Sequence, residues 1–337
     1  MRNLSVLLLA SCISLAMSTA ISAEAMSPGS HKSLKAGSGT WDCYVPKSYA
    51  DKADEFFPVL YISNPSGDPG FRGLEAWSER RGVILVTIND SKNGPTEPNI
   101  VAQDAVLGES DKLLRVHPCL RYATGQSGAG AASMKMITRY PDRFAGAMIQ
   151  VHSAGPPPKH VAVVYVGGRT DDTHPWAAVK TAYETAKGMG CPARFIDDPG
   201  THDTAVHIGE AQAALLDWLL LSTCAAHPKL DKAGLASGLA RLQAELAAIR
   251  ESPAADQPQR CETLLDIPVV ANDKKLGLEL RQVWMDGVMA AADAAGDKNR
   301  EHEVLMHAAD HPAFASCGPK ATKALNERLK ALRSEEP

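Results

Sequence analysis

Aromatic residues are scarce in this chain of 337 residues, where Phe, Trp and Tyr together make up only 5%. So few aromatic side chains argue against an aromatic-lined groove for a polymer. Positive charge is not in excess either: the net charge is -4, so the sequence lacks the basic footprint of a nucleic-acid-binding protein. No Cys-x-x-Cys pair and no Gly-x-x-x-x-Gly-Lys loop occur, which disfavours zinc ribbons, thioredoxin-type chemistry and phosphate-cradling loops.

What remains is the composition of a globular protein, with 45% hydrophobic and 22% charged residues. A chain of this length forms one large domain or two smaller ones. Its core is large enough to close off a site from which most water is excluded.

The first 25 residues have the features of a secretory signal. Arg2 supplies the positive start, residues 4–17 are apolar, and Ala23-Glu24-Ala25 offers an A-x-A cleavage site. We therefore predict a signal peptide over residues 1–25 and an exported protein, periplasmic or secreted. Two alternatives are a transmembrane anchor, for which the apolar run is short, and lipid attachment at Cys12.

Removal of this leader leaves six cysteines, an even number typical of a disulfide set in an exported protein. Their spacing alone does not fix the pairing. We expect one pair within the C-terminal region, one around the last strand–helix unit, and a third from the remaining residues: Cys261–Cys317, Cys191–Cys224 and Cys43–Cys119.

Residues 38–223 alternate between apolar runs and segments with helical spacing. The runs at 58–63, 83–88 and 161–166 are rich in Val, Ile and Leu and show little alternation with polar residues. Such runs, separated by helices, are typical of a parallel sheet that is covered on both faces. The sequence therefore predicts an α/β domain over residues 26–224.

Beyond a turn-rich boundary at 222–230 the composition changes to Ala- and Leu-rich segments with helical spacing. We predict an all-helical C-terminal region over residues 225–337. It would serve as a cap, as a structural appendage, or as a dimerisation element through which a homo-oligomer forms.

Ser127 is the most informative residue of the α/β part. It lies in a Gly-x-Ser-x-small stretch between a strand-like run at 119–124 and a helix-like run at 131–140. This is the sequence form of a nucleophile elbow, in which the neighbours of the serine must be small because the backbone turns sharply. Gly125, Gly128, Ala129 and Gly130 meet that requirement.

An activated serine needs a base and an acid that orients the base. In the α/β-hydrolase arrangement they follow the serine in the order acid, then histidine. Asp171 follows the apolar run at 161–166 and is the predicted acid, with Asp172 as the alternative. His202 lies on the turn-rich loop after the last predicted strand and is the predicted base, with His207 as the runner-up.

The oxyanion donors are expected from two places. One is the backbone N–H of Gly128, the residue after the nucleophile. The other is Ser66, with Gly67 as the alternative, in the loop 64–70, where Pro65 has no N–H to donate. We expect the substrate pocket to be lined by residues next to the nucleophile, at the end of the following strand and near the acid: Gln126, His152, His174 and Trp176.

The sequence offers two further interpretations, a metal site and a dinucleotide site, and favours neither. His307 and His311 have the i, i+4 spacing of a zinc pair on a helix, but Pro312 ends that helix at once. The Gly-rich stretch around Ser127 fits a dinucleotide fingerprint poorly. We therefore expect neither a metal nor a cofactor.

The stretch 124–132 (TGQSGAGAA), followed by RYPDRFAG at 139–146, resembles secreted α/β-hydrolases of the polyhydroxybutyrate depolymerase and feruloyl esterase type. In these proteins a Gly-x-Ser-x-Gly elbow precedes a Tyr-Pro-x-x-Phe turn into the next strand. The resemblance covers roughly residues 40–222. It implies an α/β-hydrolase fold, hydrolysis of carboxylic esters and a triad of Ser127, Asp171 and His202. The chain departs from the family at Ala129 and at Asn64-Pro65.

The sequence thus predicts an exported serine hydrolase that acts on a small or polymeric ester, without nucleic acid and without a stable membrane span. Two alternatives stay open. One is a serine peptidase or acyltransferase on the same fold, and the other is a non-catalytic binding module that kept the fold.

Overall fold

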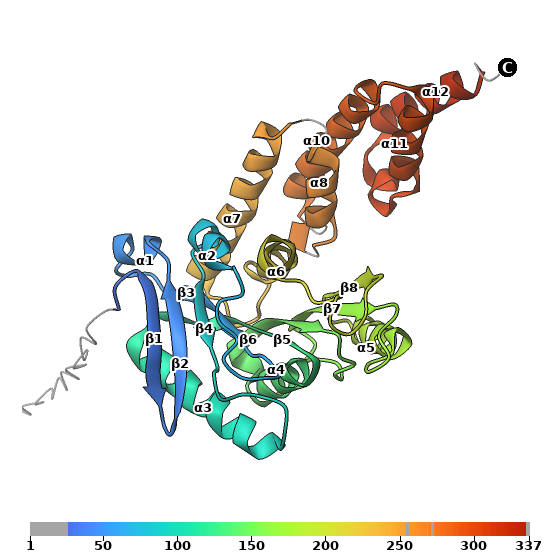
Figure 1. The fold of residues 1–337 in the computed structure, drawn as a ribbon. Helices are drawn as coiled ribbons and strands as arrows, with labels where there is room; N and C mark the ends of the chain where they lie inside the picture. The colour runs from blue at the N-terminus through green and yellow to red at the C-terminus, as the bar shows by residue number, and fades with distance from the viewer. Residues whose placement is uncertain (1–25, 254–255, 268, 271–272, 335–337) are drawn as a thin grey trace, which may run out of the picture.

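The computed structural model describes residues 26–253, 256–267, 269–270 and 273–334. The predicted signal peptide and the alternative lipid site at Cys12 lie outside the described residues. An α/β body carries an arm of helices that extends away from it (Figure 1). Within the described part of the chain, no helix combines the length and apolar character needed to cross a membrane.

The body is built on one eight-stranded sheet, whose strands have the order β1-β2-β4-β3-β5-β6-β7-β8. β2 runs antiparallel to both β1 and β4, and all other neighbours are parallel. This order, with the second strand reversed, is the α/β-hydrolase fold, so the predicted fold class is confirmed. The strands are β1 (Gly29–Ala36), β2 (Gly39–Val45), β3 (Phe57–Ile62), β4 (Ile84–Thr87), β5 (Val116–Gln126), β6 (Phe144–Gln150), β7 (Ala162–Gly168) and β8 (Ala193–Asp198).

Helices cover both faces of this sheet. The helices of the body are α1 (Ser48–Asp51), α2 (Glu75–Arg81), α3 (Thr96–Leu113), α4 (Ser127–Arg139), a 3-10 turn η1 (Pro141–Arg143), α5 (Trp176–Gly188) and α6 (Gly209–Thr223). Side chains of α3, α4 and α5 share one buried cluster with the sheet, and those of α2 and α6 share the other. Two layers of apolar contacts therefore fix the strands from both sides, as the unbroken apolar runs predicted.

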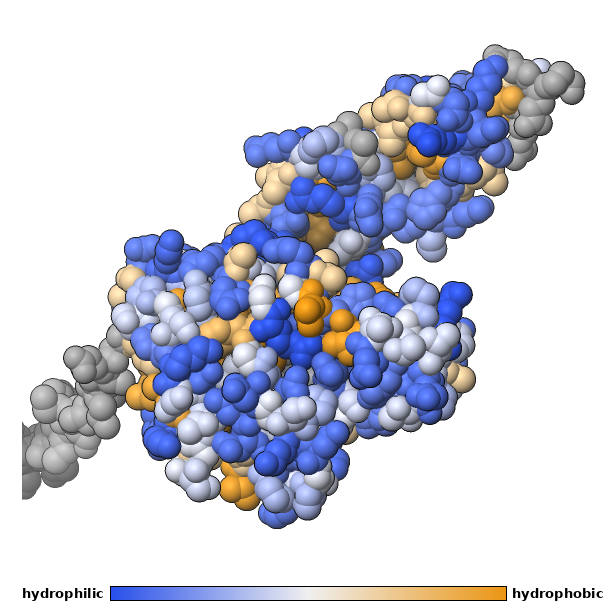
Figure 2. All heavy atoms as spheres, viewed as in Figure 1, coloured by the Kyte–Doolittle hydropathy of each residue, from blue (hydrophilic) through white to orange (hydrophobic). Residues whose placement is uncertain are grey.

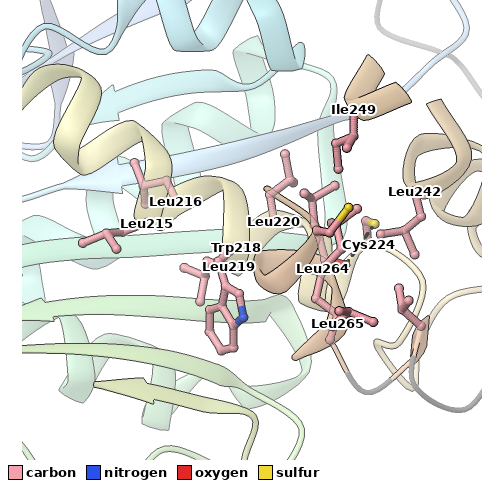
Figure 3. Close-up of a cluster of buried hydrophobic side chains, with 14 of the residues drawn as sticks. Leu215, Leu216, Trp218, Leu219, Leu220, Cys224, Leu242, Ile249, Leu264 and Leu265 are labelled. Atoms are coloured by element: carbon pink, nitrogen blue, oxygen red, sulfur yellow. Dashed lines mark hydrogen bonds between the residues drawn. The ribbon is translucent and has the colours of Figure 1, made fainter. Parts of the chain in front are cut away.

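The arm continues the second of these clusters. It comprises α7 (Lys232–Glu251), α8 (Gln257–Leu265), α10 (Lys274–Asp293), α11 (Lys298–Asp310), a 3-10 turn η3 (Pro312–Ser316) and α12 (Pro319–Ser334). Leu220 of α6 is buried together with Leu242 of α7 and Leu264 of α8 (Figure 3). The approach is close, because a Cβ added to Gly238 would lie 1.9 Å from the carbonyl oxygen of Cys224.

The arm joins the body at the amino ends of the central strands. A cleft of about 470 Å³ is lined by Phe57 and Pro58 at the start of β3, by His117 at the start of β5, and by α7. Arg81 at the end of α2 spans the joint, pairing with Asp217 of α6 at 2.8 Å and with Glu245 of α7 at 2.7 Å. The arm is therefore attached opposite the edge at which the parallel strands end.

Because body and arm share one apolar cluster, we expect them to unfold together. Leu246 of α7 is 2% exposed, so Leu246→Ala is expected to lower the free energy of unfolding by about 2–5 kcal/mol. The measurement is unfolding in urea, monitored by circular dichroism. The matched control is Leu235→Ala on the same helix, where the side chain is 41% exposed and the expected loss is about 0.5 kcal/mol or less. An early, separate transition of the arm would contradict a shared core.

The predicted disulfides are wrong. Cys43 belongs to the apolar cluster on one face of the sheet and Cys119 to the cluster on the other, and the same separation divides Cys191 from Cys224. A disulfide needs Cα atoms less than about 7 Å apart, and the sheet stands between these residues. The thiols that the structure shows to be free are Cys43, Cys119, Cys191, Cys224 and Cys261.

The predicted Cys261–Cys317 pair is therefore not formed either. Cys261 is completely buried in α8 among the apolar residues of the joint. Burial raises the pKa of the Cys261 thiol to about 12, so this thiol stays protonated and unreactive near neutral pH.

Most of the surface that faces the viewer in Figure 2 is hydrophilic, and apolar residues form small separate patches there. The exposed large apolar side chains among the described residues are spread over the chain: Phe56, Val101, Met189, Ile208, Leu235 and Leu278. Scattered residues of this kind are ordinary on a protein surface.

Candidate active site

The register of the parallel strands brings the predicted site residues to one edge of the sheet. Gln126 at the end of β5 is opposite Gln150 of β6, which is opposite Val166 of β7. Gly168, at the end of β7, is opposite Asp198 of β8. The segments that follow these four strands therefore emerge side by side, where ligands of open α/β sheets bind.

Ser127 lies directly after β5 and is the first residue of α4. Its φ is 51°, in the left-handed region that few non-glycine residues adopt. The turn is tight, because a Cβ at Gly125 would lie 2.5 Å from the carbonyl carbon and oxygen of Ala129. The local geometry of this segment is thus that of a nucleophile elbow, with Ser127 at its apex.

Gly125→Ala is therefore expected to force the elbow open. We expect a loss of about 1–3 kcal/mol in the free energy of unfolding and a marked fall in activity, because the Ser127 hydroxyl moves. Unfolding in urea and steady-state kinetics measure the two effects. Gly108→Ala on α3 is the control, since its added Cβ would meet nothing within 4 Å and a helix gains up to about 1 kcal/mol from this change. Equal behaviour of the two variants would contradict the close packing at Gly125.

Asp171 and His202 are joined at the same edge. The Asp171 carboxylate follows β7, and its Oδ2 lies 2.9 Å from Nδ1 of His202 in the segment after β8. The other oxygen, Oδ1, accepts the backbone N–H groups of Thr173 and His174, each at 2.8 Å. Asp172 is exposed, and its carboxylate accepts a hydrogen bond from the Thr173 hydroxyl at 3.4 Å. Of the two candidate acids, Asp171 is the one that the structure brings to His202.

The contacts of Asp171 also set its charge. Burial opposes ionisation of the Asp171 carboxyl, but the N–H of His174, the ring of His202 and the N–H of Thr173 together hold its pKa below the usual range. Asp171 is therefore a carboxylate at neutral pH. A carboxylate on Nδ1 keeps the proton of a neutral histidine on that nitrogen, which leaves Nε2 of His202 able to accept a proton.

The described contacts include no hydrogen bond between the Ser127 hydroxyl and His202. In ligand-free enzymes such bonds are often long and tighten only when substrate binds. A series of packed groups connects the two residues. It begins at Gly130, in the first turn of α4, which is so close to His152 that a Cβ added to Gly130 would lie 3.6 Å from Cβ of His152. The His152 ring lies 4.3 Å from that of His174, whose ring centroid is 5.5 Å from that of His202.

His152 and His174 form an uncharged polar wall beside His202. Burial, followed by the proximity of the other two rings and Lys135, lowers the pKa of His152 to about 4. Burial and the neighbouring His202 also lower the pKa of His174. Neutral rings can donate or accept hydrogen bonds, and Nδ1 of His152 is buried without a partner in the structure. Their predicted role as substrate contacts stays a prediction.

A mainly apolar groove of about 580 Å³ leads away from His152. Ala131 and Met134 of α4 form one side, and Ala154 and Pro156 form the other. Since Ala131 is one helical turn beyond Ser127, the groove begins close to the nucleophile.

Backbone strain is concentrated at this edge of the sheet. Of the five described non-glycine residues with positive φ, four follow the ends of β3, β5 and β6: Asp68, Arg72, Ser127 and Val151. Val151 is the most unusual, because a β-branched residue rarely adopts φ of 47°. Strain of this kind persists where the surroundings enforce it, and it clusters at functional sites.

The two predicted oxyanion donors differ in their present bonding. The N–H of Gly128 is among the first four of α4, which have no acceptor within the helix, so it is available to an oxyanion. The N–H of Ser66 donates to Oδ1 of Asn64 at 2.8 Å. Ser66 could serve as a donor only after leaving that bond.

The other predicted residues have structural partners. The ring nitrogen Nε2 of His207 lies 3.1 Å from Oδ2 of Asp198, and its backbone N–H donates to the Gln150 side chain at 2.7 Å. These bonds anchor the loop that carries His202. The indole N–H of Trp176 donates to Asp197 at 2.9 Å, which ties this side chain to β8.

Sequence reasoning missed Arg72. Its Nη2 donates to Oε1 of Gln126 at 3.1 Å, so this guanidinium lies next to the residue that precedes the nucleophile. A lone arginine in a loop carries no sequence signal. Only the folded chain brings it to the site.

Among the residues that the structure describes, no group of three or more His, Cys, Asp or Glu side chains has a metal-binding arrangement. His307, half of the weak zinc reading, instead pairs with Glu262 at 3.3 Å.

No protein-family model matches the chain, and no curated protein matches it in sequence. Solved structures match it at low identity. A thermostable esterase is 14% identical, with a TM-score of 0.41, and the match covers 53% of this chain and 58% of that one. A ferulic acid esterase is 17% identical over 58% of this chain and 97% of that one, with a TM-score of 0.42. An esterase of the planctomycete Thermogutta terrifontis is 13% identical over 60% and 95%, with a TM-score of 0.44. Likenesses this weak do not bear on the reaction, and the fold assignment rests on the strand order.

Proposed function

We propose that the protein is a serine hydrolase that cleaves carboxylic esters through Ser127, His202 and Asp171. The observation that carries the proposal is the 2.9 Å contact between Asp171 and His202, at the same sheet edge at which Ser127 occupies a left-handed elbow. A buried acid on a histidine and a strained serine serve no common structural purpose, but together they meet the needs of nucleophilic catalysis.

In this mechanism Nε2 of His202 takes the proton of the Ser127 hydroxyl while its oxygen attacks the ester carbonyl. Asp171 stabilises the imidazolium that forms, and the N–H of Gly128 stabilises the oxyanion. The tetrahedral intermediate collapses, the alcohol leaves with the proton from His202, and an acyl-enzyme remains. Water, deprotonated by His202, then attacks the acyl group; the bond to Ser127 breaks, His202 returns the proton to the Ser127 oxygen, and the acid leaves.

The finer assignments belong to the same proposal. We infer export from the predicted leader at 1–25, and a polyhydroxybutyrate depolymerase or feruloyl esterase-like type from the elbow and Tyr-Pro-x-x-Phe stretches. The apolar groove beside His152 has the size and lining to hold the acyl or alcohol part of a small ester or one end of a polymer. The proposed esterase differs from an acyltransferase in that water accepts the acyl group. It differs from a peptidase in that the bond it cleaves is an ester and not an amide.

The test is labelling of the purified protein with a fluorophosphonate probe, which reacts with activated serines. We expect labelling of the wild type and its loss in Ser127→Ala. Ser237→Ala is the control, because Ser237 is an exposed serine on α7, at the opposite end of the strands. A folded wild type that stays unlabelled would overturn the proposal in favour of a non-catalytic binding protein. Labelling that persists in Ser127→Ala would place the nucleophile elsewhere.

A further inference from the structure

In the part of the chain that the structure describes, the Arg72 guanidinium is a partly buried positive charge without an ion pair. Of its five N–H donors, one reaches the neutral side chain of Gln126, and Nε is buried without any partner. Among the described residues, no carboxylate forms an ion pair with it. The backbone adds strain, because φ of Arg72 is 57°.

Several other arginines of the chain are paired with acids instead. Arg80, Arg81 and Arg169 each bind a carboxylate in a two-pronged arrangement or with two acids. Burial lowers the pKa of Arg72 and no charged neighbour opposes that effect, whereas the pKa of the equally buried Arg81 is raised by Asp217 and Glu245. An uncompensated charge taken out of water destabilises a fold, so its presence calls for a purpose.

The position of Arg72 indicates that purpose. Its side chain contacts Gln126, the residue directly before Ser127, and its carbonyl oxygen accepts the N–H of Gly209 at 3.0 Å. Gly209 begins α6, just after the loop that carries His202. Arg72 therefore lies between the segment that carries the nucleophile and the segment that follows the base, and most of its guanidinium N–H groups have no acceptor among the described residues.

We propose that Arg72 binds a carboxylate carried by the substrate, so that the preferred ester is an anionic one. This rests on the proposed function of Ser127. A planar guanidinium presents paired N–H donors that match a carboxylate, and such charge-assisted pairs are about twice as strong as neutral hydrogen bonds. The carboxylate of the substrate would then form the ion pair that Arg72 lacks within the described protein. Specificity would then arise at a residue that takes no part in bond making.

The experiment compares kcat/KM for two matched pairs of esters. In the first pair the charge is on the acyl side: the mono-4-nitrophenyl ester of adipic acid against 4-nitrophenyl hexanoate. In the second it is on the leaving group: 4-acetoxybenzoate against 4-acetoxybenzamide. We expect the wild type to prefer the anionic member of at least one pair by about tenfold or more, a preference that weakens with salt. Arg72→Gln should abolish that ratio, and Arg72→Lys should restore part of it.

Arg80→Gln is the matched control. It removes the same charge from the neighbouring helix, where Arg80 pairs with exposed Glu210, and it should leave the ratio unchanged. Equal losses on both members of each pair in Arg72→Gln would mean that Arg72 only holds Gln126, and would overturn the proposal. So would a wild type that cleaves all four esters without preference. If the wild type cleaves none of them, it is the proposed hydrolase function that fails.

Discussion

His202→Ala is expected to lower kcat for 4-nitrophenyl butyrate by about 10⁴-fold or more. Without its imidazole, no group at this edge can take the Ser127 proton during attack and return it to the leaving alcohol. His152 and His174 are close to His202 but cannot replace it, because neither ring is hydrogen-bonded to a carboxylate among the described residues and the pKa of each is lowered. Steady-state kinetics, with circular dichroism to verify folding, measure the effect.

His207→Ala is the matched comparison. His207 lies on the same loop, is half-buried and also contacts a carboxylate, Asp198. We expect it to lower kcat by less than about tenfold, because it supports the loop without acting on the substrate. The reverse ranking would make His207 the base and would remove Asp171 from the proposed triad.

Asp171→Asn is expected to lower kcat by about 10³- to 10⁴-fold while leaving the protein folded. The two N–H groups that bind Oδ1 of Asp171 fix the orientation of the amide: its oxygen stays on Thr173 and His174. Its NH₂ group then faces Nδ1 of His202. A donor cannot bond to a donor, so His202 must shift its proton to Nε2, where it can no longer accept from Ser127.

Asp172→Asn tests the alternative acid with the same chemical change one residue away. Asp172 is exposed and is hydrogen-bonded to its neighbour Thr173 rather than to His202, so a change of less than about threefold is expected. A recovery of Asp171→Asn activity at high pH would agree with a tautomer effect. If Asp171→Asn proved as active as the wild type, the contact between Asp171 and His202 would be structural only.

The elbow was predictable because its causes are local. Gly125 and Ala129 must be small for the chain to turn at Ser127, and that need is visible in the sequence. The fold then places the ends of β7 and β8 nearby, so the meeting of Asp171 and His202 could be expected from their positions after apolar runs. Their chemical roles remain predictions.

Features that depend on the two sides of the sheet were not predictable. An even number of cysteines suggested disulfides, but whether Cys43 and Cys119 face the same core depends on strand direction and register. β1 was also missed, since its half-exposed residues form no apolar run, and it is held by pairing with β2. α8 was not predicted either, and its Pro258 is tolerated because it lies in the first turn of the helix.

The shared apolar cluster of α6, α7 and α8 has a practical meaning for anyone who wishes to shorten the protein. The predicted division at residue 224 falls at the end of α6, where Leu220 and Leu221 are 1% and 2% exposed. A chain cut there would expose these side chains to solvent as one continuous apolar patch. Such a fragment would aggregate on expression, even though every residue proposed for catalysis would still be present.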